Sequence, residues 1–447
     1  MSTADQSALF ISNRHRLTQL LLPRSVAVLN ANDVLPTNAD GTRPYVQNAD
    51  LYYLTGLRQE ETILVLAPDA FEPTHREVLF LREPNEHLAT WEGHKLSQAE
   101  ATQISGIRSV RWLSQFPTVF RQLMCEMDHV YLNTNEHPRA VVEVEPRDLR
   151  FIRQVQAQYP LHEYHRLAQL MHQLRVVKAP AEIELIRDAS TLTGRGFKRV
   201  LRFVRPKVTE AEVQAELAHE FTRHGGDFAY PPIIAAGANN CILHYVANDQ
   251  TCRTGQLLLL DVAASKSGYM SDLTRTVPVS GRFARRQRQV YDAVLRVFRE
   301  MIKRILPGKT TRDLRRECEA MLTEECLALG LLKKAQVRRQ DPERPAIGAY
   351  FMHGVSHPIG LDVHDVTYNH YLIQSGWVLT CEPAIYIPKE GFGIRLENTI
   401  AVTETGPVDL MADIPIEPDE IEQIMNHRRR RTTPSVRRPS ARAKAAS

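Results

Sequence analysis

The chain has 447 residues, which exceeds the usual length of a single domain and leads us to expect two domains. Its hydrophobic content of 43% can build a sizeable core, and no apolar run approaches eighteen residues, so no membrane span is expected. The net charge of +4 is uneven: residues 427–447 hold eight of the 56 Lys and Arg and no Asp or Glu, which leaves 48 basic and 52 acidic residues in 1–426.

The C-terminal segment 427–447 has no aromatic residue and no Leu, Ile or Met, so we expect a disordered basic tail. The plainer interpretation is a solvated tail with little specific role; the alternative is nonspecific contact with nucleic acid or anionic surfaces, and no specific nucleic-acid partner is expected. The six cysteines lie far apart without CxxC pairs, which predicts reduced thiols and a cytoplasmic protein. The first residues show no continuous apolar segment behind a basic start, which argues against a secretory signal.

The first part of the chain, to about residue 170, mixes strand-like and helix-like segments. Residues 61–69 (ETILVLAPD) and 77–84 (EVLFLREP) are short apolar runs bounded by Pro, Asp or Glu, as buried strands are. A helix is predicted to begin after Ser97 and to be followed by another strand. We therefore predict a self-contained α/β domain over residues 1–172.

Four amphipathic helices are predicted further along the chain. Pro180 suits the first turn of the first helix, and Pro206 stops it. Thr209 and Glu212 can form a capping box at the start of the second helix. The four predicted helices cover residues 179–205, 209–224, 285–308 and 311–330.

Strands are predicted between and after these helices. The order of helix, helix and strands therefore occurs twice, which predicts an internally duplicated α+β domain over residues 173–426. Its two halves could place their sheets around a shared cleft. The predicted strands cover residues 256–264, 273–281, 377–388 and 392–403.

Four carboxylates stand at unusual places in these strands. Asp261 ends the run LLLLD, and Asp272 precedes the next strand, so a turn between the strands can bring both together. The plainer interpretation is that each is a turn or cap residue. Glu382 and Glu397 interrupt apolar strands, where a carboxylate is costly unless it is paired, for example with Arg395, or bound to a metal.

Three histidines lie in residues 351–365, FMHGVSHPIGLDVHD. Two of them are four residues apart, the spacing that puts two imidazoles on one helix face. The interspersed Gly and Pro residues disfavour a helix, and Gly354 occupies the position of the catalytic Glu in the zinc motif HExxH. We therefore expect the histidines to have separate roles.

The four carboxylates and the histidines together form a set of ligands dominated by hard oxygen atoms. Such a set suits two divalent cations of the manganese, cobalt, zinc or iron class better than one tetrahedral zinc ion. Two such metal ions can share a hydroxide and polarise a carbonyl group, which is hydrolase chemistry.

The motifs LLLLDVAASKSGYMSDLTRTVPVSG, HGVSHPIGLDVHD, CEPAIYI and GIRLENT resemble the successive metal-site motifs of the pita-bread metallopeptidases. Within that family, M24, their order is similar to that of Xaa-Pro aminopeptidase, or aminopeptidase P. RPYVQNADLYYLTG at 43–56 resembles the N-terminal domain of this group. The resemblance implies an α+β chain in which a smaller α/β N-terminal domain precedes a C-terminal pita-bread (creatinase/aminopeptidase) catalytic domain.

The resemblance also implies the metal site. The ligands of two divalent ions, usually manganese, would be Asp261, Asp272, His357, Glu382 and Glu397. Asp272 and Glu397 would bridge the two ions, and Glu382 would also accept and pass on a proton as a bridging hydroxide attacks.

Further residues are implied to act around the metal site. His244, His353 and His364 would line the substrate cleft and take part in catalysis, the last two by hydrogen bonding to the scissile carbonyl. Arg395 would orient the carboxylates, and Tyr386 would offer a hydroxyl group to the substrate.

The implied reaction removes the N-terminal residue from peptides with proline in second place. The enzyme would form a homodimer or homotetramer, with Asp50 and Trp91 reaching a neighbouring subunit's site. The alternatives are a prolidase, which cleaves only X-Pro dipeptides, and a catalytically inactive scaffold of the same fold. Residues 366–380 contain no Arg, although relatives often carry one there to hold the peptide, so peptide-length preference stays open.

Overall fold

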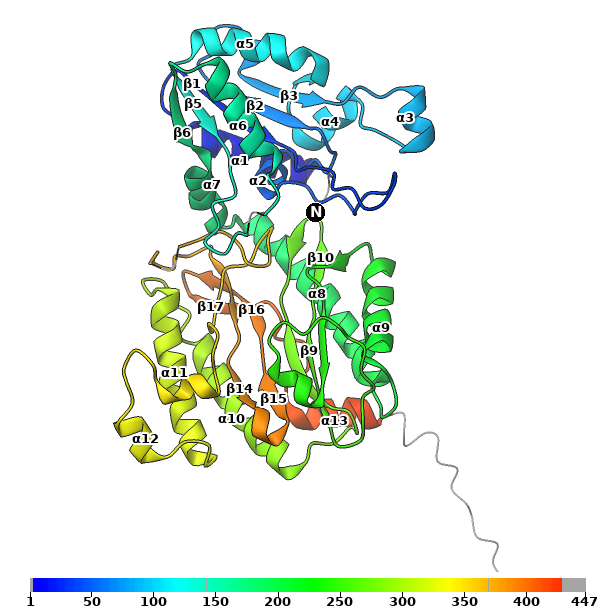
Figure 1. Cartoon of the computed structure of the whole chain (residues 1–447), viewed down its shortest axis with the longest axis vertical. Coiled ribbons are helices and arrows are strands. Elements are labelled where there is room, and N and C mark those ends of the chain that lie inside the picture. Colours follow the sequence, from blue (N-terminus) through cyan, green and yellow to red (C-terminus); the bar gives the residue numbers. More distant parts are fainter. Residues whose placement is uncertain (1–2, 142, 369, 428–447) are drawn as a thin grey trace, which may run out of the picture.

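The computed structural model describes residues 3–141, 143–368 and 370–427, so almost all of the predicted tail lies outside the described residues. The N-terminal part, at the top of Figure 1, contains a six-stranded sheet with the order β4-β3-β2-β1-β5-β6. The predicted strands near residues 61–69 and 77–84 are confirmed as β2 and β3. The six strands are β1 (Ser25–Asn30), β2 (Ile63–Leu66), β3 (Glu77–Leu81), β4 (Ser109–Trp112), β5 (His129–Leu132) and β6 (Glu163–Arg166).

Helices cover both faces of this sheet. Side chains alternate along β1, so that Val26 and Val28 join one apolar cluster while Ala27 and Leu29 join another. The helix start predicted at Ser97 is confirmed, and Ser97 forms a capping box with Glu100 at the start of α4. The predicted domain boundary at residue 172 stays a prediction, and it falls inside α7. The helices are α1 (Thr3–Thr18), α2 (Ala49–Thr55), α3 (Glu86–Trp91), α4 (Gln98–Ser105), α5 (Phe116–Glu126), α6 (Arg147–Gln158) and α7 (Leu167–Val176).

All four helices predicted in the second part of the chain are confirmed. The capping box of Thr209 and Glu212 is formed, and Gly225 follows the second helix with a left-handed φ of 71°. The third helix ends at Ile302, earlier than predicted, and the chain then turns before Pro307. The helices of this part are α8 (Pro180–Phe203), α9 (Glu210–Arg223), α10 (Arg285–Ile302), α11 (Thr311–Ala328), α12 (Lys334–Arg338) and α13 (Pro418–Asn426).

Two three-stranded sheets, β12-β9-β8 and β13-β16-β17, contain most of the predicted strands, and β14 pairs with β15. Residues 377–388 and 392–403 each form two strands instead of the one that we predicted. Each break falls at a glutamate, Glu382 or Glu397. The strands of these sheets are β8 (Ile233–Ala236), β9 (Leu257–Asp261), β12 (Thr274–Pro278), β13 (Val378–Cys381), β14 (Ala384–Ile387), β15 (Phe392–Arg395), β16 (Asn398–Thr403) and β17 (Gly406–Asp409), and a further small sheet contains β7 (Asp227–Phe228), β10 (Ala264–Lys266) and β11 (Tyr269–Met270).

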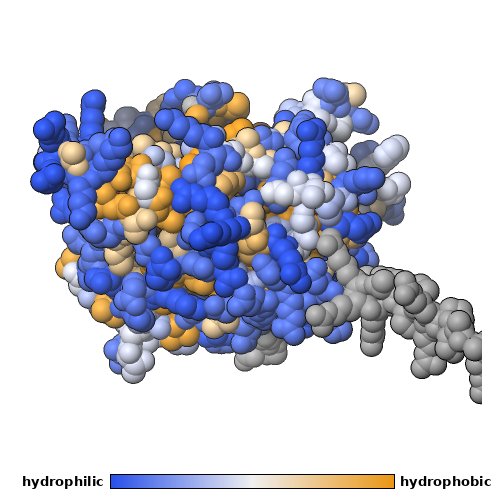
Figure 2. Space-filling view, turned by 90° about the horizontal axis from the view of Figure 1, so that it is seen from below, coloured by the Kyte–Doolittle hydropathy of each residue, from blue (hydrophilic) through white to orange (hydrophobic). Residues whose placement is uncertain are grey.

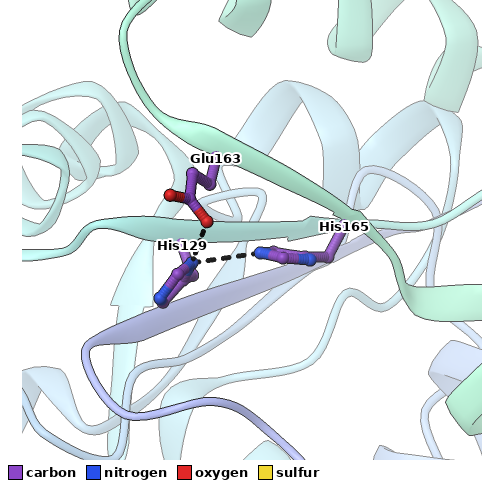
Figure 3. Close-up of side chains that lie close together, drawn as sticks. All are labelled: His129, Glu163 and His165. Atoms are coloured by element: carbon purple, nitrogen blue, oxygen red, sulfur yellow. Dashed lines mark hydrogen bonds and ion pairs between the residues drawn. The ribbon is translucent and has the colours of Figure 1, made fainter.

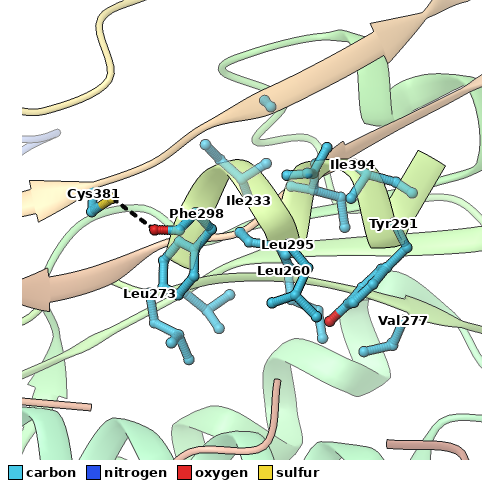
Figure 4. Packing of buried hydrophobic residues seen from close by; sticks show 14 of the residues in the cluster. Ile233, Leu260, Leu273, Val277, Tyr291, Leu295, Phe298, Cys381 and Ile394 are labelled. Carbon is cyan, nitrogen blue, oxygen red and sulfur yellow. Dashed lines mark hydrogen bonds between the residues drawn. The ribbon is translucent and has the colours of Figure 1, made fainter. Parts of the chain in front are cut away.

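The duplicated order is visible in Figure 1, where α8 and α9 lie on one side of the strands and α10 and α11 on the other. An isolated bridge between Thr274 and Glu397 joins the two sheets. Figure 4 shows the core beside this junction, where Tyr291, Leu295 and Phe298 of α10 lie next to side chains of the strands. The two halves therefore share one core.

The surface is mainly hydrophilic on the face of the second part of the chain that Figure 2 shows, with small groups of apolar side chains in between. In the described part of the chain, none of the helices is long and apolar enough to span a bilayer.

Candidate metal centre

The two aspartates meet across an antiparallel strand pair. Thr274 of β12 pairs with Asp261 at the end of β9, so Asp272, two residues before Thr274, lies beside Asp261. The hydroxyl of Tyr230 is 2.6 Å from Oδ1 of both Asp261 and Asp272. The hydroxyl of Tyr230 has one proton, so it can donate a hydrogen bond to only one of these carboxylates at a time. The spacing of the two aspartates thus predicted their proximity, whereas nothing in the sequence around Tyr230 pointed to its contact with them.

The two glutamates enter the same space where their strands break. Thr274 donates a hydrogen bond from Oγ1 to Oε2 of Glu397 at 2.6 Å. Thr380 donates from Oγ1 to Oε1 of Glu382 at 3.4 Å. Because regular pairing stops at each glutamate, these side chains are free to turn toward the aspartates.

The histidine loop contains no helix, as we predicted. His357 donates from Nδ1 to the carbonyl of Pro358 at 2.9 Å, which leaves the lone pair on Nε2. This Nε2 atom is 3.4 Å from Oδ2 of Asp272 and 3.8 Å from Oε1 of Glu382. One donor atom each of Asp272, His357 and Glu397 lies within 4.8 Å of the other two.

Arg395 is the buried cation of this site, and it pairs with an aspartate. It donates to Oδ2 of Asp261 at 2.5 Å, to the hydroxyl of Tyr386 at 2.7 Å and to Oγ1 of Thr274 at 3.0 Å. Among the described residues, Arg395 forms no ion pair with Glu382 or Glu397. The plainer interpretation, in which Arg395 neutralises the two glutamates, is therefore wrong.

The site contains more carboxylate groups than positively charged groups to pair with them. Burial raises the pKa of Glu382 to about 7, and burial with the nearby Asp272 raises the pKa of Glu397 well above its usual value. Burial also raises the pKa of Asp261, although Arg395 opposes this. Four carboxylates around one guanidinium group and one imidazole are costly to bury. The residues therefore fit a group of bound cations.

The remaining two histidines of the loop have different hydrogen-bond partners. His353 donates from Nδ1 to the carbonyl of Gly354 at 2.7 Å and accepts at Nε2 from Tyr386 at 2.9 Å. The ring of His364 lies edge-on to that of His357, with 4.4 Å between their centres. Burial, with the nearby Arg395, lowers the pKa of His353 to about 3, and burial with His357 lowers that of His364 to about 3.

A cavity of about 180 Å³ opens beside these groups, and the five predicted ligands with His244, His353, His364 and Arg395 all line it. Tyr386 is not among the residues that line this cavity. Its side chain is fully buried, and its hydroxyl forms hydrogen bonds with His353 and Arg395 on the side away from the cavity. Its predicted contact with the substrate stays a prediction, since its hydroxyl lies behind His353 and Arg395. Sequence reasoning also missed Arg139, a residue of the N-terminal part whose guanidinium lies 3.4 Å from Nδ1 of His364.

The two residues expected to reach a neighbouring subunit, Asp50 and Trp91, differ in their exposure to solvent. Asp50 is buried in its own chain, where it accepts hydrogen bonds from Arg175 and Asn133 at 2.8 Å each. The charge of Asp50 is therefore paired within its own chain, and its contact with another subunit stays a prediction. Trp91 is 76% exposed at the end of α3, and its contact with another subunit stays a prediction.

A duplicated α+β fold with four buried or half-buried carboxylates and a histidine between its halves defines a metallohydrolase of the pita-bread type. Residues 184–404 match the model of metallopeptidase family M24, and residues 10–131 match that of the aminopeptidase P N-terminal domain. The chain belongs to the aminopeptidase P group of this family.

Individual proteins of this group are similar to the chain over most of their length. The Xaa-Pro aminopeptidase of Escherichia coli K12 is 34% identical over 434 residues, covering 93% of this chain and 97% of that protein. Aminopeptidase P of E. coli with the inhibitor Pro-Leu has a TM-score of 0.83 and 33% identity, covering 95% of this chain and 99% of the other. A zinc-substituted form of that enzyme in complex with product has the same score and identity, with coverages of 94% and 98%.

Proposed function

We propose that the chain is a metal-dependent Xaa-Pro aminopeptidase, which removes the first residue of peptides that have proline in second place. The observation that carries this proposal is the excess of buried carboxylate charge around one cavity wall, with His357 among the carboxylates. The similarity to Xaa-Pro aminopeptidases over 93% of the chain supports the same activity.

The metal ions would be held by the five ligands predicted from the sequence, Asp261, Asp272, His357, Glu382 and Glu397. Hard oxygen donors dominate this set, which favours manganese among the divalent ions that it can accept. When bound, two such ions supply Lewis acidity and lower the pKa of water. Tyr230, Thr274 and Arg395 hydrogen-bond to the carboxylates and so fix the directions of their free oxygens.

Glu382 is suited to move a proton during the reaction. A general acid or base must lie within hydrogen-bond reach of the groups between which it moves a proton. The carboxylate of Glu382 lies on the cavity wall, within 3.5 Å of Nδ1 of His353. We therefore assign Glu382 the transfer of a proton from the attacking water to the leaving nitrogen.

His364 is the better placed of the two neutral histidines to donate a hydrogen bond to the substrate. Arg139 donates toward Nδ1 of His364, which leaves the imidazole proton on Nε2. That atom has no hydrogen-bond partner among the residues that the structure describes. Both ring nitrogens of His353 are already engaged within the protein. We assign His364 the stabilisation of the scissile carbonyl oxygen as negative charge develops there.

The shape and polarity of the cavity suit a proline ring. An X-Pro bond is a tertiary amide without an N–H group, so recognition depends on contacts with the ring. The apolar side chains of Ile233, Leu243 and Val363 line the cavity beside the polar groups. They offer a surface for the ring next to the carbonyl that is attacked.

A comparison of two substrates tests this assignment against the prolidase alternative. The chain, loaded with manganese, is given Gly-Pro-Pro and Gly-Pro in separate reactions, and released glycine is measured. We expect rapid turnover of the tripeptide. This turnover should be lost after chelation of the metal and should recover when manganese is added. Cleavage of the dipeptide alone would mean a prolidase, and turnover that survives chelation would contradict the metal-dependent mechanism.

We further propose a cytoplasmic homodimer or homotetramer. All six cysteines are free thiols in the structure, which suits a reducing compartment. The exposed Trp91 offers an aromatic contact of the kind enriched at subunit interfaces. Sedimentation equilibrium of the wild type and of Trp91→Ser tests the assembly: we expect an oligomer that dissociates at higher concentration in the variant. A wild-type monomer would contradict this proposal without affecting the proposed activity.

A further inference from the structure

A second group of metal-ligating side chains lies in the N-terminal part, on β5 and β6. Nδ1 of His129 is 3.1 Å from Nε2 of His165 and 3.2 Å from Oε2 of Glu163. Figure 3 shows the three side chains turned toward one another across the two strands. One donor atom from each lies within 4.8 Å of the other two. This cluster contains none of the residues that line the catalytic cavity.

Strand register explains why these side chains meet. β5 and β6 are parallel, with His129 opposite Glu163 and Tyr131 opposite His165, so all four side chains project from one face. The ring of Tyr131 stacks on His165 with 4.8 Å between centres, which fixes the direction of that imidazole. β6 is the edge strand of the sheet, and the side chain of Glu163 is 72% exposed. An ion can therefore reach the cluster from solvent.

The separations within the cluster match those between the ligands of a tetrahedral ion. Zinc ligands at about 2.0–2.1 Å are about 3.3–3.4 Å apart at the tetrahedral angle. The two separations from Nδ1 of His129 lie close to this value. Hydrogen bonds alone explain the cluster less well than a bound ion does. The single proton on Nδ1 of His129 cannot form a full hydrogen bond to both His165 and Glu163. Two imidazoles and one carboxylate are a ligand set that zinc accepts, with water in the fourth place.

We propose that His129, Glu163 and His165 bind a divalent transition-metal ion of the zinc class, separate from the catalytic ions. The ion would join the edge strand β6 to β5 through side chains, in addition to the backbone pairing. This inference does not depend on the proposed peptidase activity. It also predicts one metal ion per chain beyond those of the catalytic centre.

Chemical labelling of histidines in the full-length wild type tests the site directly. Diethyl pyrocarbonate reacts with a free imidazole lone pair, and a neutral imidazole that binds metal at one nitrogen carries its proton on the other. We expect saturating Zn²⁺ to reduce labelling of His129 and His165 at least fivefold relative to the chelated protein, as mapped by mass spectrometry. His94, an exposed histidine beside the single carboxylate of Glu100, is the internal control and should be unchanged. Equal labelling with and without Zn²⁺ would overturn the proposal.

Metal counting on full-length variants gives a second readout. We expect His129→Asn/His165→Asn to bind one Zn²⁺ per chain fewer than the wild type after equilibrium dialysis. The matched variant His94→Asn should keep the wild-type number. An unchanged number in the double variant would contradict the proposal. The labelling of the wild type decides the question if the double variant does not fold.

Discussion

Arg175 donates a hydrogen bond from Nη2 to Oδ1 of Asp365 at 2.6 Å, and both side chains are almost fully buried. Arg175 also donates to Asp50 in α2, and Lys178 lies 2.9 Å from the other oxygen of Asp365. These ion pairs connect the N-terminal part to the end of the histidine loop. Since Asp365 follows His364 directly, the same contacts help to position that histidine.

Replacing Asp365 tests how much these ion pairs stabilise the fold. Burial would raise the pKa of Asp365, but Lys178 and Arg175 outweigh it, so the pKa is lowered. A lowered carboxyl pKa stabilises the fold above the unfolded pKa of about 3.9, and this stabilisation is lost as the pH falls through the folded pKa. We expect Asp365→Asn to lower the free energy of unfolding by about 3–5 kcal/mol at pH 7, because two buried cations lose their anion.

Urea unfolding followed by circular dichroism at pH 7 and at decreasing pH measures this effect. The difference between wild type and variant should shrink as the pH falls below 4. Asp362→Asn is the matched control, since Asp362 also binds Arg175 but its side chain is 51% exposed, and we expect a loss of under about 1 kcal/mol. An equal loss in both variants would show that burial of the ion pair is not the cause.

Asp272→Asn is expected to remove metal from the catalytic centre. The amide keeps the size of the side chain but loses the charge next to Tyr230 and His357. We expect kcat/KM on X-Pro peptides to fall by at least about 100-fold, with a matching fall in bound metal measured by mass spectrometry. Asp188→Asn, on the exposed face of α8, should change neither quantity. Full activity in the Asp272 variant would refute the assigned ligand set.

Tyr230→Phe tests the residue that sequence reasoning did not find. The change removes the hydroxyl that contacts both aspartates and leaves the ring in place. Partners that orient metal ligands contribute about 10- to 100-fold to metal affinity, so we expect a loss in that range in competition with a chelator. Tyr291→Phe removes a buried hydroxyl that bonds the carbonyl of Ile416, outside the site. If both variants lose metal equally, the effect comes from general destabilisation.

His364→Asn is expected to slow turnover without loss of metal. Removing one donor to a developing oxyanion costs about 10²- to 10³-fold in kcat. Because burial and His357 lower the pKa of His364 to about 3, this imidazole stays neutral and its role should not titrate between pH 5 and 9. Steady-state kinetics with metal analysis checks both statements, and His219→Asn on the exposed face of α9 is the control. Loss of metal in the His364 variant would indicate a ligand instead of a hydrogen-bond donor.

Local features of the sequence predicted the elements of the fold well. The capping box at Thr209 and the stop at Pro206 depend on contacts within a few residues, and both helix ends lie where these signals indicated. The glycines and proline of the histidine loop likewise excluded a helix, and the structure agrees. Motif order then allowed recognition of the family, which the comparisons confirm.

The sequence by itself determined the four long helices of the second part, several of the strands, the carboxylates that interrupt them and the family of the chain. Each of these features depends on a short segment of the sequence, because backbone preference and the pattern of apolar residues act between residues that are close along the chain. Only the tertiary structure decided that Tyr230 touches two aspartates, that Arg139 comes from the other part of the chain to meet His364, and that Tyr386 faces inward. These contacts join residues far apart in sequence, and they exist only once the sheets and helices have packed around the site.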